Sequence, residues 1–107
     1  MTNRREPSAT LLADQGRPLI VIVGEADLAL SEQFAGILRA VDVAAGPIAV
    51  DLSRVTFMDS TMIGFLLRLR SLSASPVTLV HPSPKALRLL QLTAVDDLFQ
   101  ITASGSQ

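Results

Sequence analysis

A serine and a threonine, Ser60 and Thr61, stand at the start of an apolar stretch of the chain. The spacing of the apolar residues predicts a helix over residues 60–72, which places Ser60 at its N-terminus and Gly64 one turn further along. A phosphate on Ser60 would meet free backbone N–H groups and the positive end of the helix dipole, which stabilise an anion at an exposed end by about 0.3–1 kcal/mol. Ser60 is therefore a candidate phosphorylation site, and the alternative is that Asp59 or Ser60 only caps the helix.

Two further side chains could take part in catalysis. His81 follows a predicted strand and could complete a triad with Ser60, but Ser60 lacks the Gly-x-Ser-x-Gly context of many serine hydrolases. Asp51 could accept a phosphoryl group as in receiver domains, but no acidic pair follows the first strand, and Lys85 is the only lysine. A hydrogen-bonded loop residue at His81 and a loop-organising aspartate at Asp51 are the preferred interpretations, and no enzymatic activity is expected.

The composition excludes several other kinds of site. The chain has no cysteine and one histidine, so disulfides, thiol catalysis and an ordinary metal site are not expected. The formal net charge is −1 and the basic residues do not cluster beyond two arginine pairs, which does not fit a nucleic-acid-binding surface. The sequence has no Gly-x-x-x-x-Gly-Lys-[Ser/Thr] loop for ATP. We therefore expect no cofactor, and a protein or a small molecule as the partner.

The length and hydropathy indicate one small domain. The chain has 107 residues, of which 49% are hydrophobic. No apolar run approaches the roughly 20 residues of a membrane-spanning helix, and no apolar stretch of signal-peptide length follows Met1. A cytoplasmic location without membrane insertion is therefore expected. The domain is expected to span residues 1–107, with its core at about residues 8–102 and flexible ends at residues 1–7 and 103–107.

Strand and helix patterns alternate along the chain. Residues 19–23 are continuously apolar and rich in β-branched side chains, which predicts a strand that is buried on both faces and closed by Gly24. Ser31 is the predicted N-cap of the next helix, which Gly46-Pro47 stops. Ser83-Pro84 opens another helix, at an N-cap followed by proline. The other predicted elements are strands at residues 11–13, 48–52, 77–80 and 98–101, and a loop at residues 53–59.

This alternation predicts an α/β domain whose parallel strands are joined by right-handed crossovers through the helices. The loops that follow the strands then share one edge of the sheet. Residues 24–27, 53–60 and 81–83 should converge at that edge, where ligands and partners of such sheets tend to bind. The site is expected among these loops.

Four segments of the chain resemble the anti-sigma factor antagonists, which are built on the STAS domain. They are Gly24-Glu25-Ala26-Asp27-Leu28, residues 50–64, Pro82-Ser83-Pro84 and Leu92-Thr93. The resemblance extends from about Leu19 to Ile101, and residues 51–64 are its specific part. It implies a single STAS-like α/β domain, with a mostly parallel β-sheet, an antiparallel first strand and helices packed against the sheet.

The resemblance also implies a function. In this family the serine that matches Ser60 is phosphorylated by a partner that is both a serine kinase and an anti-sigma factor. The unphosphorylated protein binds this partner and releases a sigma factor, phosphorylation switches it off, and a phosphatase can act on the phosphoserine. Asp27 matches a family aspartate that lies beside the serine and contributes to partner binding. Asp59, Thr61 and Gly64 are expected in the same surface.

Two other functions stay open. The same fold could act as a constitutive structural or regulatory STAS subunit, in a sensory assembly or with the ATPase of a lipid transporter, without a phosphoswitch. A small-molecule or nucleotide-binding module could use the same edge of the sheet.

Two positions depart from the family pattern. Met62 stands where glycine is common, and Ala94 stands where glycine usually follows the Leu-Thr pair. We expect Met62 in the partner-binding surface, because thioether side chains suit adaptable interfaces, and the equally weighted alternative is that it packs under the neighbouring helix. If position 94 is left-handed, alanine there costs roughly 1 kcal/mol relative to glycine.

Overall fold

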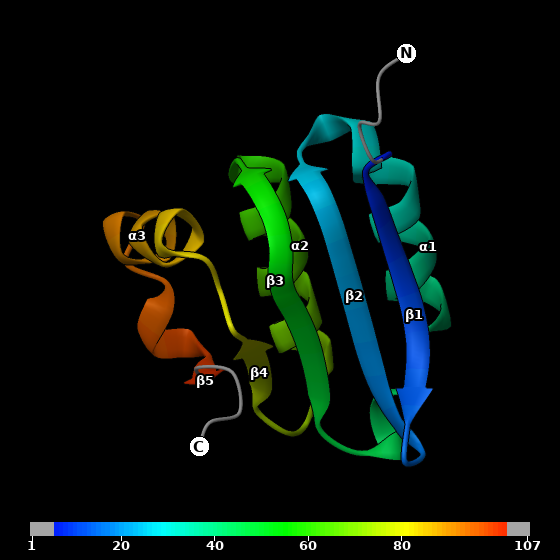
Figure 1. Ribbon diagram of the computed structural model, residues 1–107. Coiled ribbons are helices and arrows are strands. Elements are labelled where there is room, and N and C mark those ends of the chain that lie inside the picture. The colour runs from blue at the N-terminus through cyan, green and yellow to red at the C-terminus, as the bar shows by residue number, and fades with distance from the viewer. Residues whose placement is uncertain (1–5, 103–107) are drawn as a thin grey trace.

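The computed structural model describes residues 6–102. The sheet has five strands in the order β1-β2-β3-β4-β5, with β1 antiparallel to β2 and every other pair parallel (Figure 1). This confirms the expected α/β fold with an antiparallel first strand. The elements are β1 (Ser8–Asp14), β2 (Arg17–Ala26), the short 3-10 helix η1 (Leu28–Leu30), α1 (Ser31–Ala40), η2 (Val43–Ala45), β3 (Ile48–Met58), α2 (Ser60–Leu72), β4 (Val77–Val80), α3 (Pro84–Leu92), η3 (Asp96–Leu98) and β5 (Gln100–Thr102).

The two ends of the chain that we expected to be flexible, residues 1–7 and 103–107, lie outside the described residues except for Glu6 and Pro7. The chain enters the sheet through a tight hairpin. Gln15 and Gly16, which join β1 to β2, have φ angles of 54° and 81°. Positive φ at both central residues is the geometry of the two-residue turn that best matches the twist of paired strands.

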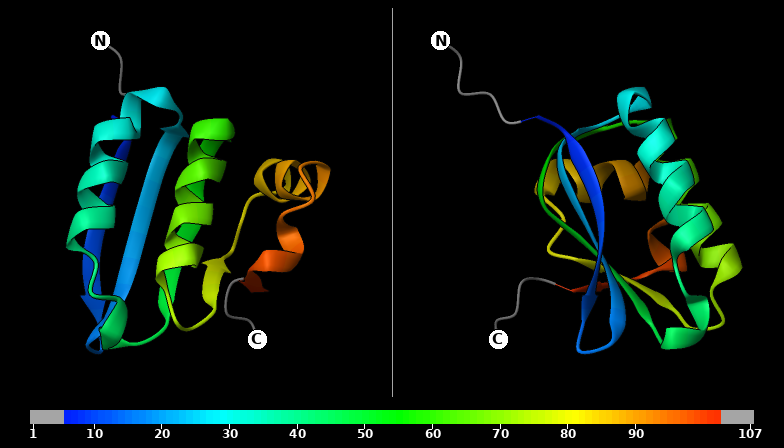
Figure 2. Two further views of the ribbon diagram at one scale, coloured as in Figure 1. Left: turned by 180° about the vertical axis from the view of Figure 1, so that it is seen from behind. Right: turned by 90° about the vertical axis from the view of Figure 1, so that its right-hand side faces the viewer.

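Helices α1 and α2 cover one face of the sheet (Figure 2). In β2, Ile20 and Ile22 are buried under these helices, whereas Val21 and Val23 point to the opposite face and are only half-buried. The prediction that this strand is buried on both faces is therefore wrong. All residues of this run are apolar, so the sequence does not show that buried and half-buried positions alternate. The alternation arises because the helices cover one face of the sheet.

Strand β3 is much longer than predicted. It continues to Met58, so the expected loop at residues 53–59 is strand apart from Asp59. The spacing of its buried residues changes from two to three after Leu52, because Val55 and Met58 are the next buried positions. At both places the register with β2 shifts, so β3 has an extra residue each time. These irregularities are β-bulges, in which one strand has an extra residue opposite its partner and bends locally. Because of the extra residue, successive buried side chains of β3 are three positions apart there instead of two.

Gly24 does not end β2 but lies within it, at φ +84°. A Cβ at this position would lie 3.2 Å from the Cα of Pro7. Both the left-handed backbone and the close approach of Pro7 favour glycine here. The predicted strand end was wrong because the sequence does not distinguish a glycine that stops a strand from one inside it.

In the last third of the domain the start of α3 is as predicted, but the strand predicted at residues 98–101 is Gln100–Thr102, because the 3-10 helix Asp96–Leu98 occupies its expected start. The Ser83 side chain accepts a hydrogen bond from the Ala86 N–H at 3.2 Å, and Pro84 is the first residue of α3. Ala94 has a φ angle of 60°, so this position is left-handed and the cost of alanine relative to glycine applies. Within β3, the residues that pair with β4 are Ile48–Asp51. Helix α3 lies beside the remaining half of β3 (Figure 1).

Candidate functional site

The ends of β2 and β3 bring two aspartates together. Ala26 pairs with Met58 in the sheet, and the Asp59 N–H donates to the Ala26 carbonyl at 3.4 Å. Asp27 and Asp59 are therefore the residues that follow two paired strand ends. This confirms that residues 24–27 and 53–60 converge at one edge of the sheet.

Each of these aspartates caps the helical segment that follows it. Asp27 accepts a hydrogen bond from the Ala29 N–H at 3.0 Å at the start of η1. Asp59 accepts one from the Thr61 N–H at 2.9 Å at the start of α2. Ser31, the predicted N-cap of the preceding helix, is instead the first residue of α1, because η1 leads directly into that helix. The capping role considered for Asp59 is thus present in the structure.

Ser60 is the first residue of α2 and is exposed. Its hydroxyl is therefore accessible at the N-terminus of a 13-residue helix, close to Asp59. Thr61 is half-buried, and Gly64, one turn beyond Ser60, is exposed. The structure thus places Ser60, Thr61 and Gly64 on or near one surface.

Met62 has no exposed surface. It belongs to the inward face of α2 with Phe65, Leu66 and Leu69, which all lie in the hydrophobic core. A side chain that is completely enclosed by its own domain does not contact a partner of the folded protein. The expectation that Met62 forms part of the partner-binding surface is therefore corrected, and the packing alternative is the one that the structure supports.

His81 is separated from Ser60. Val80 pairs with Asp51 in the middle of β3, seven residues before the strand ends at Met58. The same stretch corresponds to residues 21–26 of β2, five residues or roughly 16 Å at about 3.3 Å per residue, so β4 ends well short of the strand end that precedes Ser60. His81 is exposed, has a φ angle of 55°, and donates its backbone N–H to the Thr102 carbonyl at 2.7 Å. A Ser60–His81 pair is therefore not assembled. Of the third segment expected at this edge, Ser83 shares a hollow with Phe57 and Met58 at the end of β3, whereas His81 lies further back along the sheet.

Asp51 has a local structural role. Its side chain accepts a hydrogen bond from the Ser53 N–H at 2.9 Å, at the first bulge of β3. This agrees with the loop-organising role preferred from the sequence, except that the segment it organises is a bulged strand.

Two large apolar side chains near this edge were missed. Leu28, directly after Asp27, is 71% exposed, and Phe57, two residues before Asp59, is 52% exposed. Single exposed apolar side chains are normal on protein surfaces, so these two add apolar area to this edge without marking a contact by themselves. The sequence gives a weak signal for Leu28 only, because it follows the aspartate of the family-like segment.

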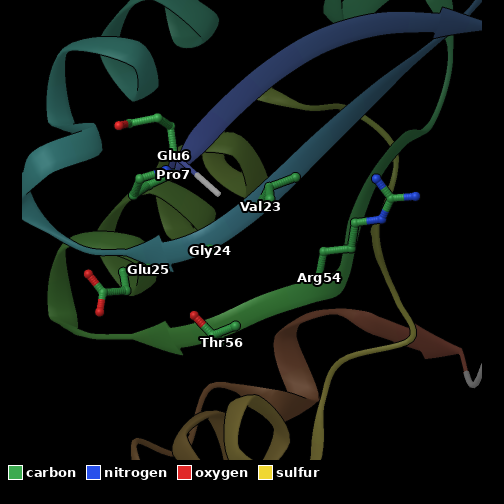
Figure 3. A pocket seen from close by; sticks show the side chains of 7 residues that line it. All are labelled: Glu6, Pro7, Val23, Gly24, Glu25, Arg54 and Thr56. Atoms are coloured by element: carbon green, nitrogen blue, oxygen red, sulfur yellow. The ribbon is translucent and has the colours of Figure 1, made fainter. Parts of the chain in front are cut away.

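A hollow of about 680 Å³ lies on the open face of the sheet. Among its charged side chains, Glu6 and Glu25 point to one side and Arg54 points away from them (Figure 3). A small-molecule site normally has polar groups that converge on the ligand. This hollow does not provide such an arrangement.

Within residues 6–102, no group of three or more histidine, aspartate or glutamate side chains is placed to hold a metal ion. The helices in that part of the chain are also too short or too polar to cross a bilayer.

A family model described as "Mlab, STAS domain" matches residues 10–101. The chain belongs to the STAS domain family. Among curated proteins no sequence match was found. Solved structures include similar chains, and the anti-sigma factor antagonist SpoIIAA in its unphosphorylated form is 25% identical, with a TM-score of 0.67 over 92% of this chain and 90% of that one.

Two further structures support the same fold for this STAS domain. An anti-sigma factor antagonist from Mycobacterium paratuberculosis is 20% identical, with a TM-score of 0.73 over 90% of this chain and 85% of that one. The Bacillus cell fate determinant SpoIIAA in its phosphorylated form is 22% identical, with a TM-score of 0.58 over 90% of this chain and 92% of that one.

Proposed function

We propose that this STAS domain is an anti-sigma factor antagonist that works by partner switching. Unphosphorylated, it binds an anti-sigma factor that is also a serine kinase, and so releases a sigma factor in the cytoplasm. Phosphorylation of Ser60 ends this binding, and a phosphatase restores it. The observation that carries the proposal is the exposure of Ser60 at the first position of α2, beside Asp59.

The proposed domain is a substrate and not an enzyme. Its partner surface comprises Ser60 with Asp27, Asp59, Thr61 and Gly64, and the exposed Leu28 adds an apolar contact. SpoIIAA, whose unphosphorylated form is 25% identical to this chain, is named as an anti-sigma factor antagonist and was solved in a phosphorylated form as well. These names support a phosphorylation cycle, and the exposed Ser60 is the position that we assign to it here.

The direction of the switch follows from charge. Phosphoserine adds about −1.5 to −2 charges at neutral pH, next to the carboxylate of Asp59. A partner surface formed around a neutral hydroxyl does not compensate this charge. A desolvated contact between like charges costs several kcal/mol, which corresponds to a loss of affinity of about 100-fold or more.

The test is calorimetric titration of the purified anti-sigma factor kinase of the same organism into three proteins. Wild type and Ser60→Ala are expected to bind with similar affinity, and Ser60→Asp at least about tenfold more weakly, since one carboxylate supplies less charge than a phosphate. Circular dichroism verifies that all three are folded. Equal affinities for the three folded proteins would refute the phosphoswitch.

That result would favour the second candidate, a constitutive STAS subunit of a larger assembly without a phosphorylation cycle. One observation favours it directly: the family model that matches the chain has the description "Mlab, STAS domain" and not that of an anti-sigma factor antagonist. Recovery of a transporter ATPase or a sensory complex with the Ser60→Ala protein would support this candidate.

A further inference from the structure

Leu28 and Ser60 occupy equivalent positions at two neighbouring strand ends. Ala26 and Met58 pair in the sheet, and one aspartate follows each of them. The side chain of each aspartate accepts a hydrogen bond from the backbone N–H two residues further on, at 3.0 Å and 2.9 Å. Leu28 comes directly after the first aspartate, and Ser60 comes directly after the second. The two residues therefore leave the same edge of the sheet, one strand apart.

The distance between these two positions is short. Neighbouring strands lie about 4.7–4.9 Å apart, and the ends of β2 and β3 are side by side (Figure 1). The Asp59 N–H still donates to the Ala26 carbonyl at 3.4 Å, so the strands stay together up to the residue before Ser60. Both aspartates have the same extended conformation, and the chain leaves both strands in the same way. The residues that follow the aspartates are thus close neighbours on one surface.

The fold does not account for a leucine at position 28. Its side chain is 71% exposed, and the buried residue of η1 is Leu30. Exposure alone does not mark a contact, because single exposed apolar side chains are normal. Leu92, the last residue of α3, is 70% exposed on the other side of β3 from β2 (Figure 1). Leu28 differs from Leu92 in its place, next to the exposed Ser60.

A kinase that phosphorylates Ser60 has to cover the surface around this hydroxyl. In the transfer, the Ser60 oxygen forms a bond to the γ-phosphorus of ATP, and the bond from that phosphorus to the bridging oxygen breaks. ADP leaves with that oxygen, and the hydroxyl proton goes to a base of the kinase or to water. The reacting atoms have to be aligned at about 3–3.5 Å before the step. A protein that holds ATP this close to Ser60 also contacts a side chain about one strand spacing away.

We propose that Leu28 is a specificity-determining residue for the phosphorylation of Ser60. The kinase covers Leu28 with an apolar surface while it holds the serine hydroxyl. It therefore recognises two segments of the chain that are neighbours only in the folded domain. Because Asp27 and Asp59 make the rest of this edge acidic, Leu28 supplies its apolar contact. The inference rests on the function proposed above, and names a residue by which the kinase recognises this substrate.

The test measures phosphorylation of the full chain by the purified anti-sigma factor kinase of the same organism with ATP. Leu28→Ala is compared with the matched control Leu92→Ala, which shortens an equally exposed leucine. Leu28→Ala should raise KM about tenfold with kcat little changed, because burial of a leucine stabilises the bound substrate and the transition state alike. Leu92→Ala should retain the KM of wild type. Leu28→Met keeps an apolar side chain of similar volume and should recover most of the loss.

The two proposals fail in different ways. Circular dichroism should show that every variant melts close to wild type, as expected for exposed positions. If wild type is phosphorylated but Leu28→Ala keeps its KM, or if Leu92→Ala is impaired equally, Leu28 does not determine specificity and the phosphoswitch remains. If the kinase does not phosphorylate wild type, both proposals are overturned.

Discussion

Asp27 and Asp59 hold the same backbone conformation at the ends of neighbouring strands, with φ −133° and ψ −161° for Asp27 and φ −133° and ψ −163° for Asp59. Each accepts a hydrogen bond from the N–H two residues further on, at 3.0 and 2.9 Å. The two carboxylates are thus at equivalent places on one edge, and Ser60 follows the second of them. A modification of Ser60 changes the charge of a surface that is already acidic.

The first prediction concerns which hydroxyl is phosphorylated. Ser60 is exposed, whereas Thr61 is half-buried and lines a shallow hollow between α1 and α2. We expect the kinase partner and ATP to modify Ser60 only. Fragmentation mass spectrometry of the phosphopeptide locates the phosphate, and modification confined to Thr61 would contradict the assignment.

The second prediction concerns Met62. Because this side chain is fully buried, Met62→Gly should lower the free energy of unfolding by about 3–5 kcal/mol, through lost packing and the helix penalty of glycine. Met62→Leu conserves the volume and should cost less than about 1.5 kcal/mol. Urea denaturation measures both. An unchanged stability of Met62→Gly would mean that Met62 is not a core residue.

Met62 illustrates what the sequence could not decide. Its position after Ser60 and Thr61 suggested a surface residue, but the inward face of α2 is set by where the sheet lies. The helical period itself places Met62 on the apolar arc with Phe65 and Leu69, which favours packing, and its complete burial agrees with that alternative.

The alternation of strands and helices, the capped start of α2 and the N-cap at Ser83 could be predicted because each depends on local residue types. The second half of β3 could not. Its buried residues Leu52, Val55 and Met58 are spaced by three, since two bulges interrupt the strand. A spacing of three does not match the period of a regular strand, so the sequence alone does not indicate a strand over this segment.

The third prediction separates two effects of glycine. Gly16 and Gly24 have similar φ angles, 81° and 84°, but a Cβ on Gly16 would meet no atom within 4 Å, whereas one on Gly24 would lie 3.2 Å from the Cα of Pro7. Gly16→Ala should therefore cost only the left-handed backbone, about 1–2 kcal/mol. Gly24→Ala should cost at least about 2 kcal/mol, because the chain at Pro7 must also move. Thermal unfolding of the two variants compares them directly, and equal losses would show that the Pro7 contact is unimportant.

The last prediction concerns Asp59, which caps α2 and also lies next to any phosphate on Ser60. The helix N-terminus stabilises the phosphate by about 0.3–1 kcal/mol, whereas the carboxylate of Asp59 repels it. Asp59→Asn retains an oxygen that can cap the Thr61 N–H and removes the charge, so it should leave the stability of the unphosphorylated domain within about 0.5 kcal/mol of wild type. Phosphorylation should then stabilise Asp59→Asn more than wild type.

Denaturation of the phosphorylated and unphosphorylated forms of both proteins gives this difference, and it should shrink in high salt because the charges lie at the surface. Asp59→Ala is the matched control. It should lose about 1 kcal/mol in both forms through the missing cap, while it removes the same negative charge. If phosphorylation changes the stability of all three proteins equally, Asp59 does not sense the phosphate. The acidity of this edge would then affect only the partner.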